Sequence, residues 1–196
     1  PAYIRRVEVG GKGWSDAVKE ARDAGAQTGL TITVGHENAL IGRAREALGW
    51  KVTQIGTWPL SFPFYIDNAK SAAEGSLMAQ TFIAEPSNER RSTFLANFRR
   101  AYKVERITVP VAAAQGYDAG YLLAYALFTI KNKTIDGPAI KHALETNDRP
   151  YYGVVTTYKN AFSTTDHNAI TMNMLYLGVV RNGAITFAYP EDARRN

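Results

Sequence analysis

The stretch that decides the fold is residues 30–58, LTITVGHENALIGRAREALGWKVTQIGTW. Leu30 to Val34 is a β-branched run typical of a buried strand, and Lys51 to Ile55 is a second such run. Between them, residues 37–48 repeat apolar side chains at helical spacing: Leu40, Ile41, Ala44, Ala47 and Leu48. A strand, a helix and a strand in this order predict a parallel β-α-β unit with a right-handed crossover.

The same alternation continues on both sides of this stretch. Upstream, Val7 to Val9 alternates like a short strand, and Ser15 is placed to cap the helix that follows. Downstream, Ser76 to Phe82 is the next predicted strand. We therefore predict an α/β fold, a Rossmann-like three-layer arrangement in which helices flank a parallel sheet.

The second half of the chain predicts three helices. Residues 89–102 would bury one face: Phe94, Leu95, Phe98, Ala101 and Tyr102. After an extended segment from Val109 to Ala114, a strongly apolar helix is expected from Gly116 to Asn132. Asp136 is placed to cap a third helix that ends near Glu145.

The C-terminal part predicts antiparallel strands. The expected segments are Tyr151 to Tyr158, Ala169 to Val180 and Ala184 to Ala188. Asn182-Gly183 between two apolar runs is a strong signal for a two-residue hairpin turn.

Composition and charge narrow the function classes. The net charge is +5, but the basic residues are scattered and accompany no element that reads nucleic acid, so no nucleic-acid partner is expected. No apolar run approaches the ~20 residues that span a bilayer. The chain opens on Pro1-Ala2-Tyr3 without a signal peptide, so we expect a processed or truncated product whose export must be inferred by resemblance.

No catalytic, metal or cofactor site is expected from the motifs. Gly10-Gly11-Lys12-Gly13 lacks the spacing of a phosphate-binding loop, and the chain has no cysteine. The three histidines, His36, His142 and His167, show no metal-ligand spacing. We interpret Asp166-His167-Asn168 as a turn rather than an acid–base dyad, because Asp and Asn readily bond their own backbone.

Two candidate binding residues come directly after neighbouring predicted strands. His36 follows the strand that ends at Val34, and Trp58 follows the strand that ends at Ile55. Open α/β sheets bind ligands beyond the carboxyl ends of their parallel strands. Small-molecule pockets also use aromatic walls with a few polar groups. We therefore expect His36 and Trp58 at a common edge of the sheet, facing a ligand.

Several short motifs resemble one family. They are Val34-Gly35-His36-Glu37, Gly49-Trp50-Lys51-Val52, Ile55-Gly56-Thr57-Trp58, Ala73-Glu74-Gly75, Gln115-Gly116-Tyr117-Asp118-Ala119 and Thr165-Asp166-His167-Asn168. Their order and spacing are similar to type I periplasmic solute-binding proteins, in the branched-chain amino-acid group of ABC transporter receptors. The resemblance implies two α/β lobes that hold a ligand in the cleft between them, in a chain nearly twice this length.

The resemblance also implies a division of the chain. Residues 1–109 would form the ligand-binding second lobe, and residues 110–148 would be helices that return to a largely absent first lobe. Residues 149–196 would supply crossing strands and the C-terminal hairpin. The apolar helix that begins near Tyr117 would then be partly uncovered, which favours pairing with a second copy of the chain.

The resemblance also implies which individual residues of this chain contact the ligand. The resemblance implies ligand contacts from Gly35, His36, Thr57, Trp58 and Tyr117. Amino-acid binders of the family place an acidic side chain just after the glycine that matches Gly56, whereas Trp58 stands there in this chain. A tryptophan offers stacking or apolar contact. The ligands considered are therefore an amino acid, an aromatic or other carboxylate, and an amide.

The function implied is that of a receptor in an ABC uptake transporter. It would capture a small organic molecule in the periplasm or outside the cell and deliver it to a membrane permease, without catalysis. A ligand-sensing regulatory domain of the same fold is an alternative, because fold alone does not separate the two. A small α/β enzyme is a second alternative, and it would need a convergent nucleophile, base or metal site.

Overall fold

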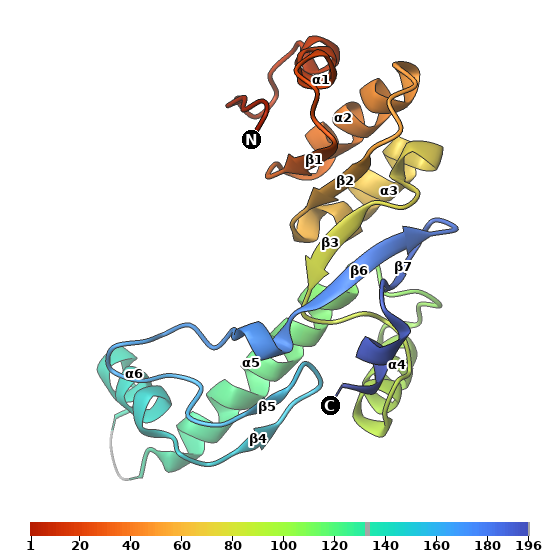
Figure 1. Cartoon of the computed structure of the whole chain (residues 1–196). Helices are drawn as coiled ribbons and strands as arrows, with labels where there is room; N and C mark the ends of the chain where they lie inside the picture. The colour runs from red at the N-terminus through yellow and green to blue at the C-terminus, as the bar shows by residue number, and fades with distance from the viewer. Residues whose placement is uncertain (132–133, 196) are drawn as a thin grey trace. The chain divides into compact units, whose positions relative to one another are not determined.

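The computed structural model describes residues 1–131 and 134–195, which form two compact units (Figure 1). The first unit joins Pro1–Ile83 to Tyr176–Ala193, and the second contains Ala84–Leu175 with the last residues from Arg194. The division falls near residue 83, whereas the resemblance placed residues 1–109 in one lobe. The assignment of family lobes to residue ranges stays a prediction.

A five-stranded mixed sheet forms the centre of the first unit. Its strands in spatial order are β1 (Thr28–Thr31), β2 (Thr53–Gly56), β3 (Leu77–Gln80), β6 (Tyr176–Arg181) and β7 (Ala184–Phe187). The first three are parallel, with Leu30 opposite Ile55, and the last two run antiparallel to their neighbours. The predicted α/β class and the parallel pairing are confirmed. The predicted first strand is corrected, because it covers Thr28–Thr31 rather than Leu30–Val34, and Leu30, Ile32 and Val34 are 68%, 76% and 52% exposed rather than buried.

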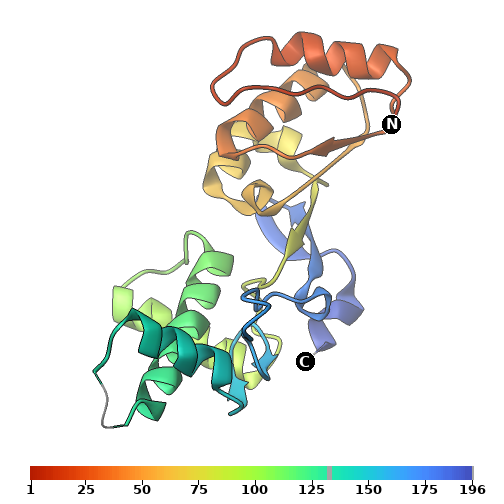
Figure 2. The same ribbon diagram turned by 90° about the vertical axis from the view of Figure 1, so that its left-hand side faces the viewer.

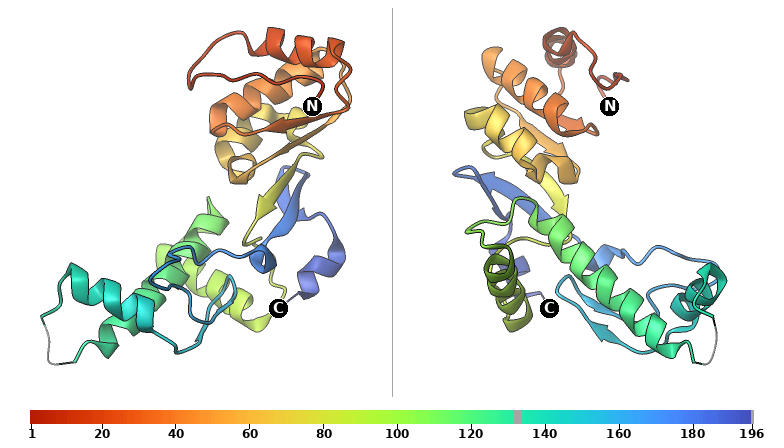
Figure 3. Two further views of the ribbon diagram at one scale, coloured as in Figure 1. Left: turned by 60° about the vertical axis from the view of Figure 1, so that its left-hand side comes forward. Right: turned by 180° about the vertical axis from the view of Figure 1, so that it is seen from behind.

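The helices of the first unit are α1 (Trp14–Asp23), α2 (Gly35–Ala47) and α3 (Pro63–Ala69), with short 3-10 turns η1 (Trp58–Ser61) and η2 (Lys70–Ala73). Of these, α2 and α3 pack on this sheet, and α1 packs on α2. Both α2 and α3 lie on the same side of the strands (Figures 1 and 3). The core beneath them is formed by Ala39, Leu60, Tyr65, Ile66, Ala69, Ala72, Ala73, Met78 and Val180.

A buried polar network fixes the strands and α2 relative to one another. The Gln54 side-chain amide donates to Thr31 Oγ1 and to the carbonyl of Asn38, at 3.4 and 3.3 Å. The Tyr65 hydroxyl reaches both Gln54 Oε1 and Ser76 Oγ, the latter at 2.6 Å. Because buried polar groups are costly unless hydrogen-bonded, this network holds the ends of β1, β2 and α2 in one arrangement.

The predicted hairpin turn between β6 and β7 is confirmed. Asn182 and Gly183 have φ values of 51° and 70°, as a two-residue turn of this kind requires. Both of their backbone N–H groups donate to the Glu74 carboxylate, at 2.9 and 2.8 Å. Glu74 therefore has a structural role within the Ala73-Glu74-Gly75 motif. A last 3-10 turn, η4 (Pro190–Arg194), follows β7.

The second unit is mainly helical. It contains α4 (Glu89–Tyr102), α5 (Pro110–Thr129), α6 (Gly137–Thr146), the two-residue strands β4 (Tyr151–Tyr152) and β5 (Thr157–Tyr158), and η3 (Met172–Met174). The side chain of Asp136 accepts from the N–H of Ala139 at 2.9 Å, which confirms the predicted cap of α6. The β4–β5 hairpin lies along α5 (Figures 1 and 3). Within the described residues, no helix combines the length and apolar character that a bilayer crossing requires.

Two predictions near the N-terminus are wrong. Val7 to Val9 is not a strand, because it lies outside the sheet and gains no ladder partner there, and Val9 is 82% exposed. Figure 2 shows this N-terminal segment running apart from the strands before it reaches α1. Ser15 does not cap α1. The cap position is held by Gly13 with φ 84°, and no side chain bonds there.

Three predictions about the second half are also wrong. Residues 151–158 are not one strand, because β4 and β5 pair antiparallel with each other across the turn between them. Val109 to Ala114 is not extended, because α5 begins at Pro110, and proline is favoured at the first helical position. Residues 169–180 are not one strand, since η3 precedes β6. The predicted far end of the apolar helix, Asn132, lies outside the described residues.

The predicted buried faces of two helices are corrected as well. In α2 the buried residues are Glu37, Asn38, Ala39 and Gly42. The helix approaches the sheet through small residues, and a Cβ on Gly42 would lie 3.3 Å from the Gln54 side chain. In α4, Phe94 and Leu95 are buried as expected, whereas Ala101 and Tyr102 are exposed, and the Tyr102 ring lies tilted against that of Phe98 with 4.5 Å between the centroids.

Candidate functional site

The candidate site lies at the carboxyl ends of β1 and β2. These strands are parallel neighbours, with Thr31 opposite Gly56, so the segments that follow them leave from the same edge of the sheet. The first segment enters α2 at Gly35, and the second enters η1 at Trp58. The expected common edge is therefore present, at the position where open α/β sheets bind ligands.

A cavity of about 340 Å³ opens at this edge. Its apolar lining is formed by Val7, Val9, Trp14, Ile32, Val34 and Pro59, and its polar lining by Glu8, Thr33, Glu37 and Thr57. The volume is within the range of about 300–1,000 Å³ that is usual for small-molecule sites. Apolar walls with a few polar groups are also the usual composition of such sites.

Glu37 is the buried charged group of the cavity wall. Its residue surface is 6% exposed, and it lies in the first turn of α2, where the helix dipole favours a negative charge. Its Oε1 accepts a hydrogen bond from the Gly10 N–H at 3.0 Å. This bond, together with the N–H of Glu37 itself, lowers the pKa of the Glu37 carboxyl despite burial. The carboxylate is therefore ionised at neutral pH.

The N-terminal wall is held in place by two local hydrogen bonds. The Trp14 indole N–H donates to the carbonyl of Gly11 at 2.8 Å, and the Gly11 N–H donates to the carbonyl of Glu8 at 3.0 Å. The turn is tight, because a Cβ on Gly11 would lie 2.9 Å from the Glu8 carbonyl oxygen. Trp14 is 8% exposed, so its ring forms a fixed apolar surface of the cavity.

Of the four predicted site residues in the first unit, one lines the cavity: Thr57, which is exposed. Gly35, His36 and Trp58 are not among the lining residues. His36 is exposed in the first turn of α2, and Trp58 is half-buried at the start of η1, where its carbonyl accepts from Ser61 Oγ at 2.8 Å. Gly35 has a packing role, because a Cβ there would lie 2.9 Å from Cβ of Phe64. Ligand contact by these residues stays a prediction.

Sequence reasoning missed Glu37 and Trp14 as cavity residues. Glu37 stands only three residues beyond Val34, within the Val34-Gly35-His36-Glu37 motif, so its position after a strand was a usable signal. Trp14 carried a weaker signal, because its role depends on the wall formed by residues 7–14 outside the sheet.

The fifth predicted residue, Tyr117, belongs to the second unit. It lies on α5 with 41% of its surface exposed, and its ring centroid is 5.2 Å from Phe94 and 4.9 Å from Tyr121. A hydrogen bond with Tyr121 and burial raise the pKa of Tyr117 to about 12, so its hydroxyl is neutral at physiological pH. An exposed aromatic surface of this kind is suited to contact with a ligand or another chain.

A buried carboxylate organises the same unit. Asp118 accepts from the hydroxyls of Tyr151 and Tyr158 at 3.1 and 3.2 Å, and from the N–H groups of Val154 and Val155 at 2.9 and 2.8 Å. We call Asp118 and these four donors the Asp118 clasp. Burial raises the pKa of Asp118, and the four hydrogen bonds oppose that rise. The clasp attaches the β4–β5 hairpin to α5, which gives the Tyr117-Asp118-Ala119 motif a structural role.

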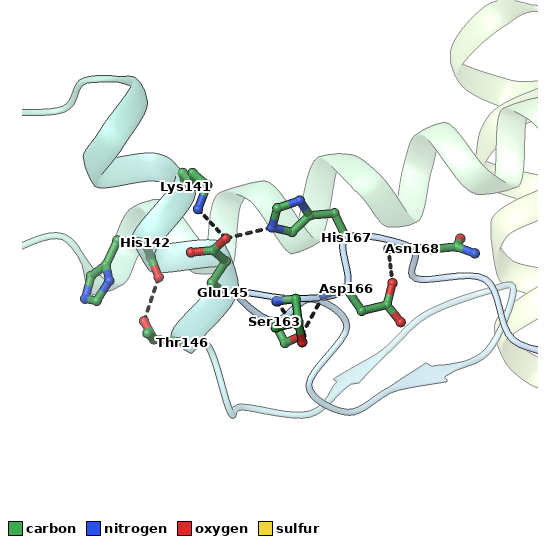
Figure 4. A network of polar contacts seen from close by, with 9 residues as sticks. Lys141, His142, Glu145, Thr146, Ser163, Asp166, His167 and Asn168 are labelled. Carbon is green, nitrogen blue, oxygen red and sulfur yellow. Dashed lines mark hydrogen bonds and ion pairs between the residues drawn. The ribbon is translucent and has the colours of Figure 1, made fainter.

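His167, in the turn at residues 166–168, is paired with Glu145 of α6. His167 Nε2 lies 2.6 Å from Glu145 Oε1, which also bonds Lys141, whereas His142 points elsewhere (Figure 4). Asp166 Oδ1 accepts from the Asn168 N–H at 2.8 Å, which confirms the predicted turn. The group joins the loop at residues 163–168 to the end of α6.

Comparison with known proteins gives a consistent family and fold. A family model described as periplasmic binding protein matches residues 3–184. Among solved structures, the leucine-binding protein LivK of Thermotoga maritima shares 20% identity at a TM-score of 0.73, covering 93% of this chain and 50% of that chain. The substrate-binding protein LivJ of Streptococcus pneumoniae, solved with isoleucine, shares 19% identity at a TM-score of 0.71, covering 87% of this chain and 46% of that one.

A third structure carries a different ligand. A solute-binding protein of an ABC transporter from R. palustris, solved with benzoate, shares 19% identity at a TM-score of 0.67, covering 88% of this chain and 45% of that one. At these identities the likeness shows the fold. The chain spans about half the length of these structures. No curated protein matches its sequence.

Proposed function

Because the chain belongs to the periplasmic binding protein family, we propose that it captures a small organic molecule for an ABC uptake transporter. The observation that carries this proposal is the cavity of about 340 Å³ at the carboxyl ends of β1 and β2. A location in the periplasm or outside the cell and delivery to a membrane permease are parts of the same proposal.

Binding without covalent chemistry suits the groups at the cavity. A general acid needs a pKa raised toward the working pH, whereas the bond from Gly10 lowers the pKa of Glu37. An ionised and buried carboxylate is suited to holding a ligand by an ion pair or a hydrogen bond. We therefore infer that the cavity residues bind and orient, and that no bond is made or broken there.

The ligands to test first are those of the related structures. Leucine and isoleucine are about the size that the cavity accommodates, and benzoate represents the aromatic carboxylates. We propose Thr57, Trp58, His36 and Gly35 as contact or rim residues of the first unit. Tyr117 is a separate candidate on the second unit, to be tested by its own substitution.

A thermal-shift measurement on the 196-residue chain tests the capture. A ligand that binds only the native state at ten times its Kd adds about 1.4 kcal/mol, which raises the Tm by about 3–6 °C. Leucine, isoleucine, benzoate and the corresponding amides are titrated to millimolar concentration. An unchanged Tm with every compound would contradict the proposal.

A matched pair of substitutions locates the binding. Thr57→Val removes a hydroxyl from the cavity wall, and Thr53→Val makes the same change on the exposed side of β2, away from the cavity. Losing one hydrogen bond to the ligand costs about 1 kcal/mol, or about fivefold in Kd. We expect this loss for Thr57→Val alone. Equal affinity of the two variants would move the ligand away from this cavity.

A further inference from the structure

The charge of the cavity is opposite to that of the chain. The chain has 23 Lys and Arg against 18 Asp and Glu, yet the charged residues that line the cavity are Glu8 and Glu37. None of the described lining residues is a lysine or arginine. Electrostatic complementarity sets ligand specificity. A ligand whose only charged group is a carboxylate would therefore meet repulsion at this wall.

Glu37 is held as a fixed acceptor rather than as a mobile surface group. The Gly10 N–H anchors one of its carboxylate oxygens at 3.0 Å, and its residue surface is 6% exposed. The start of α2 is itself positioned by Asn38, whose side chain bonds both Oγ1 and the carbonyl oxygen of Thr33. A buried carboxylate is most strongly stabilised by an opposite charge that also donates a hydrogen bond.

The rest of the wall is apolar. Trp14, Ile32, Val34 and Pro59 present rings and branched side chains, and Ile32 and Val34 are 76% and 52% exposed. An alkyl or aryl group placed on these side chains would remove them from water, at about 25 cal/mol per Å² of apolar surface. The cavity thus offers a negative end and an apolar body.

We propose that the ligand of this cavity is a small organic cation, with an ammonium group paired to Glu37 and Glu8 and an apolar body against Trp14, Ile32 and Val34. The inference rests on the proposed function and narrows its ligand class. Trp58 occupies the place where the resemblance expects an acidic residue. The acidic group proposed in its place, Glu37, lies in the first turn of α2, the helix that follows the neighbouring strand β1. A free carboxylate on the ligand then lowers affinity, so an amine binds more tightly than the amino acid that carries the same alkyl group.

Three probes that share the 3-methylbutyl group and differ in their charged groups test the ligand class by calorimetry on the full chain. They are 3-methylbutylamine, leucine and 4-methylpentanoate. We expect the amine to bind most tightly, leucine more weakly and the carboxylate most weakly. Affinity for the carboxylate equal to or above that for the amine would overturn the inference.

Charge-removing variants identify the residues. Glu37→Gln keeps an oxygen that accepts from the Gly10 N–H but loses the charge, and we expect amine binding to weaken by about tenfold or more. Glu8→Gln, whose side chain is exposed, should weaken it less. Glu46→Gln makes the same change on the exposed last turn of α2 and should leave Kd unchanged. Amine affinity that is the same in Glu37→Gln and Glu46→Gln would refute the assignment.

The outcomes separate the inference from the proposed function. If benzoate or 4-methylpentanoate binds and the amine does not, the inference that the ligand is a cation is wrong, whereas the proposed capture of a small solute is still supported. Failure of every probe and of the metabolites titrated above contradicts both. If Glu37→Gln lost its circular-dichroism signature, the order of the three probes on the unmodified chain and the Glu8→Gln comparison would decide the question.

Discussion

Removing the Asp118 carboxylate should destabilise the second unit, because four hydrogen-bond donors lose their shared acceptor. In Asp118→Ala, the N–H groups of Val154 and Val155 lose their acceptor. These residues are 8% and 2% exposed, and a buried donor without a partner costs about 1–3 kcal/mol. The two amides alone therefore predict about 2–6 kcal/mol.

The two tyrosine hydroxyls add a smaller share. Tyr151 and Tyr158 are 6% and 8% exposed, and water that enters the vacated space can bond their hydroxyls. Added to the range for the two amides, this smaller share gives an expected total loss of about 3–7 kcal/mol for Asp118→Ala. Asp118→Asn keeps the shape and one acceptor oxygen but turns an NH2 group toward the other donors, so about half of that loss is expected.

Urea unfolding followed by near-ultraviolet circular dichroism measures this loss, because the stacked rings of Tyr151 and Tyr158 report on the hairpin. Asp148→Ala, an exposed position on the same unit, is the matched control and should change the unfolding free energy by less than about 0.5 kcal/mol. A loss below about 1 kcal/mol for Asp118→Ala would show that the clasp does not hold the hairpin on α5.

Four further outcomes are expected. Gly153→Ala would bring a methyl carbon to 2.5 Å from the clasp carboxylate, so the same urea assay should report a loss of about 2–4 kcal/mol; an unchanged midpoint would contradict the contact. Trp58→Ala should weaken binding of an apolar or aromatic ligand by at least about 1 kcal/mol in calorimetry, and equal affinity would remove Trp58 from the site. Hydrogen bonds from Lys141 and His167 lower the pKa of Glu145, so the contact between α6 and the 163–168 loop is complete above the ordinary value of 4.5 and is lost as the pH falls through the lower folded value. The protection factors of the amides in that loop, which correct for the intrinsic pH dependence of exchange, should fall as the pH falls through that value, and unchanged protection factors would contradict the contact. Light scattering should report a second copy of the chain if the exposed apolar side chains of α5 pair, and a monomer mass at all concentrations would contradict that prediction.

The parallel core could be predicted because its signals are local. Leu30 to Val34 and Lys51 to Ile55 are β-branched runs, and the helix between them has clear ends, so the topology followed from periodicity. The Asn182-Gly183 turn and the Asp136 cap are likewise decided by the conformations and hydrogen bonds of one or two residues. Both were located correctly from the sequence.

The wrong predictions concern features that depend on contacts with other segments and not on local sequence signals. Val7 to Val9 has the alternation of a strand, but a strand also needs a neighbour with free backbone groups, and no local pattern reveals whether one is present. The buried face of α2 was misassigned because apolar periodicity ignores close approach. Gly42 and Ala39 face the sheet, so the larger Leu40 and Ile41 are left half-buried.

At the candidate site, the position of the sheet edge was easier to predict than the side chains that line the cavity. Strand order alone brings the residues after Val34 and after Ile55 to one edge, and this was foreseeable. Which of those side chains faces the cavity depends on where α2 begins. Its first residue is Gly35, so the helix turns His36 outward and buries Glu37. A shift of one position thus exchanges an imidazole for an ionised carboxylate at the cavity wall, and this carboxylate is the group with which the proposed organic cation would pair.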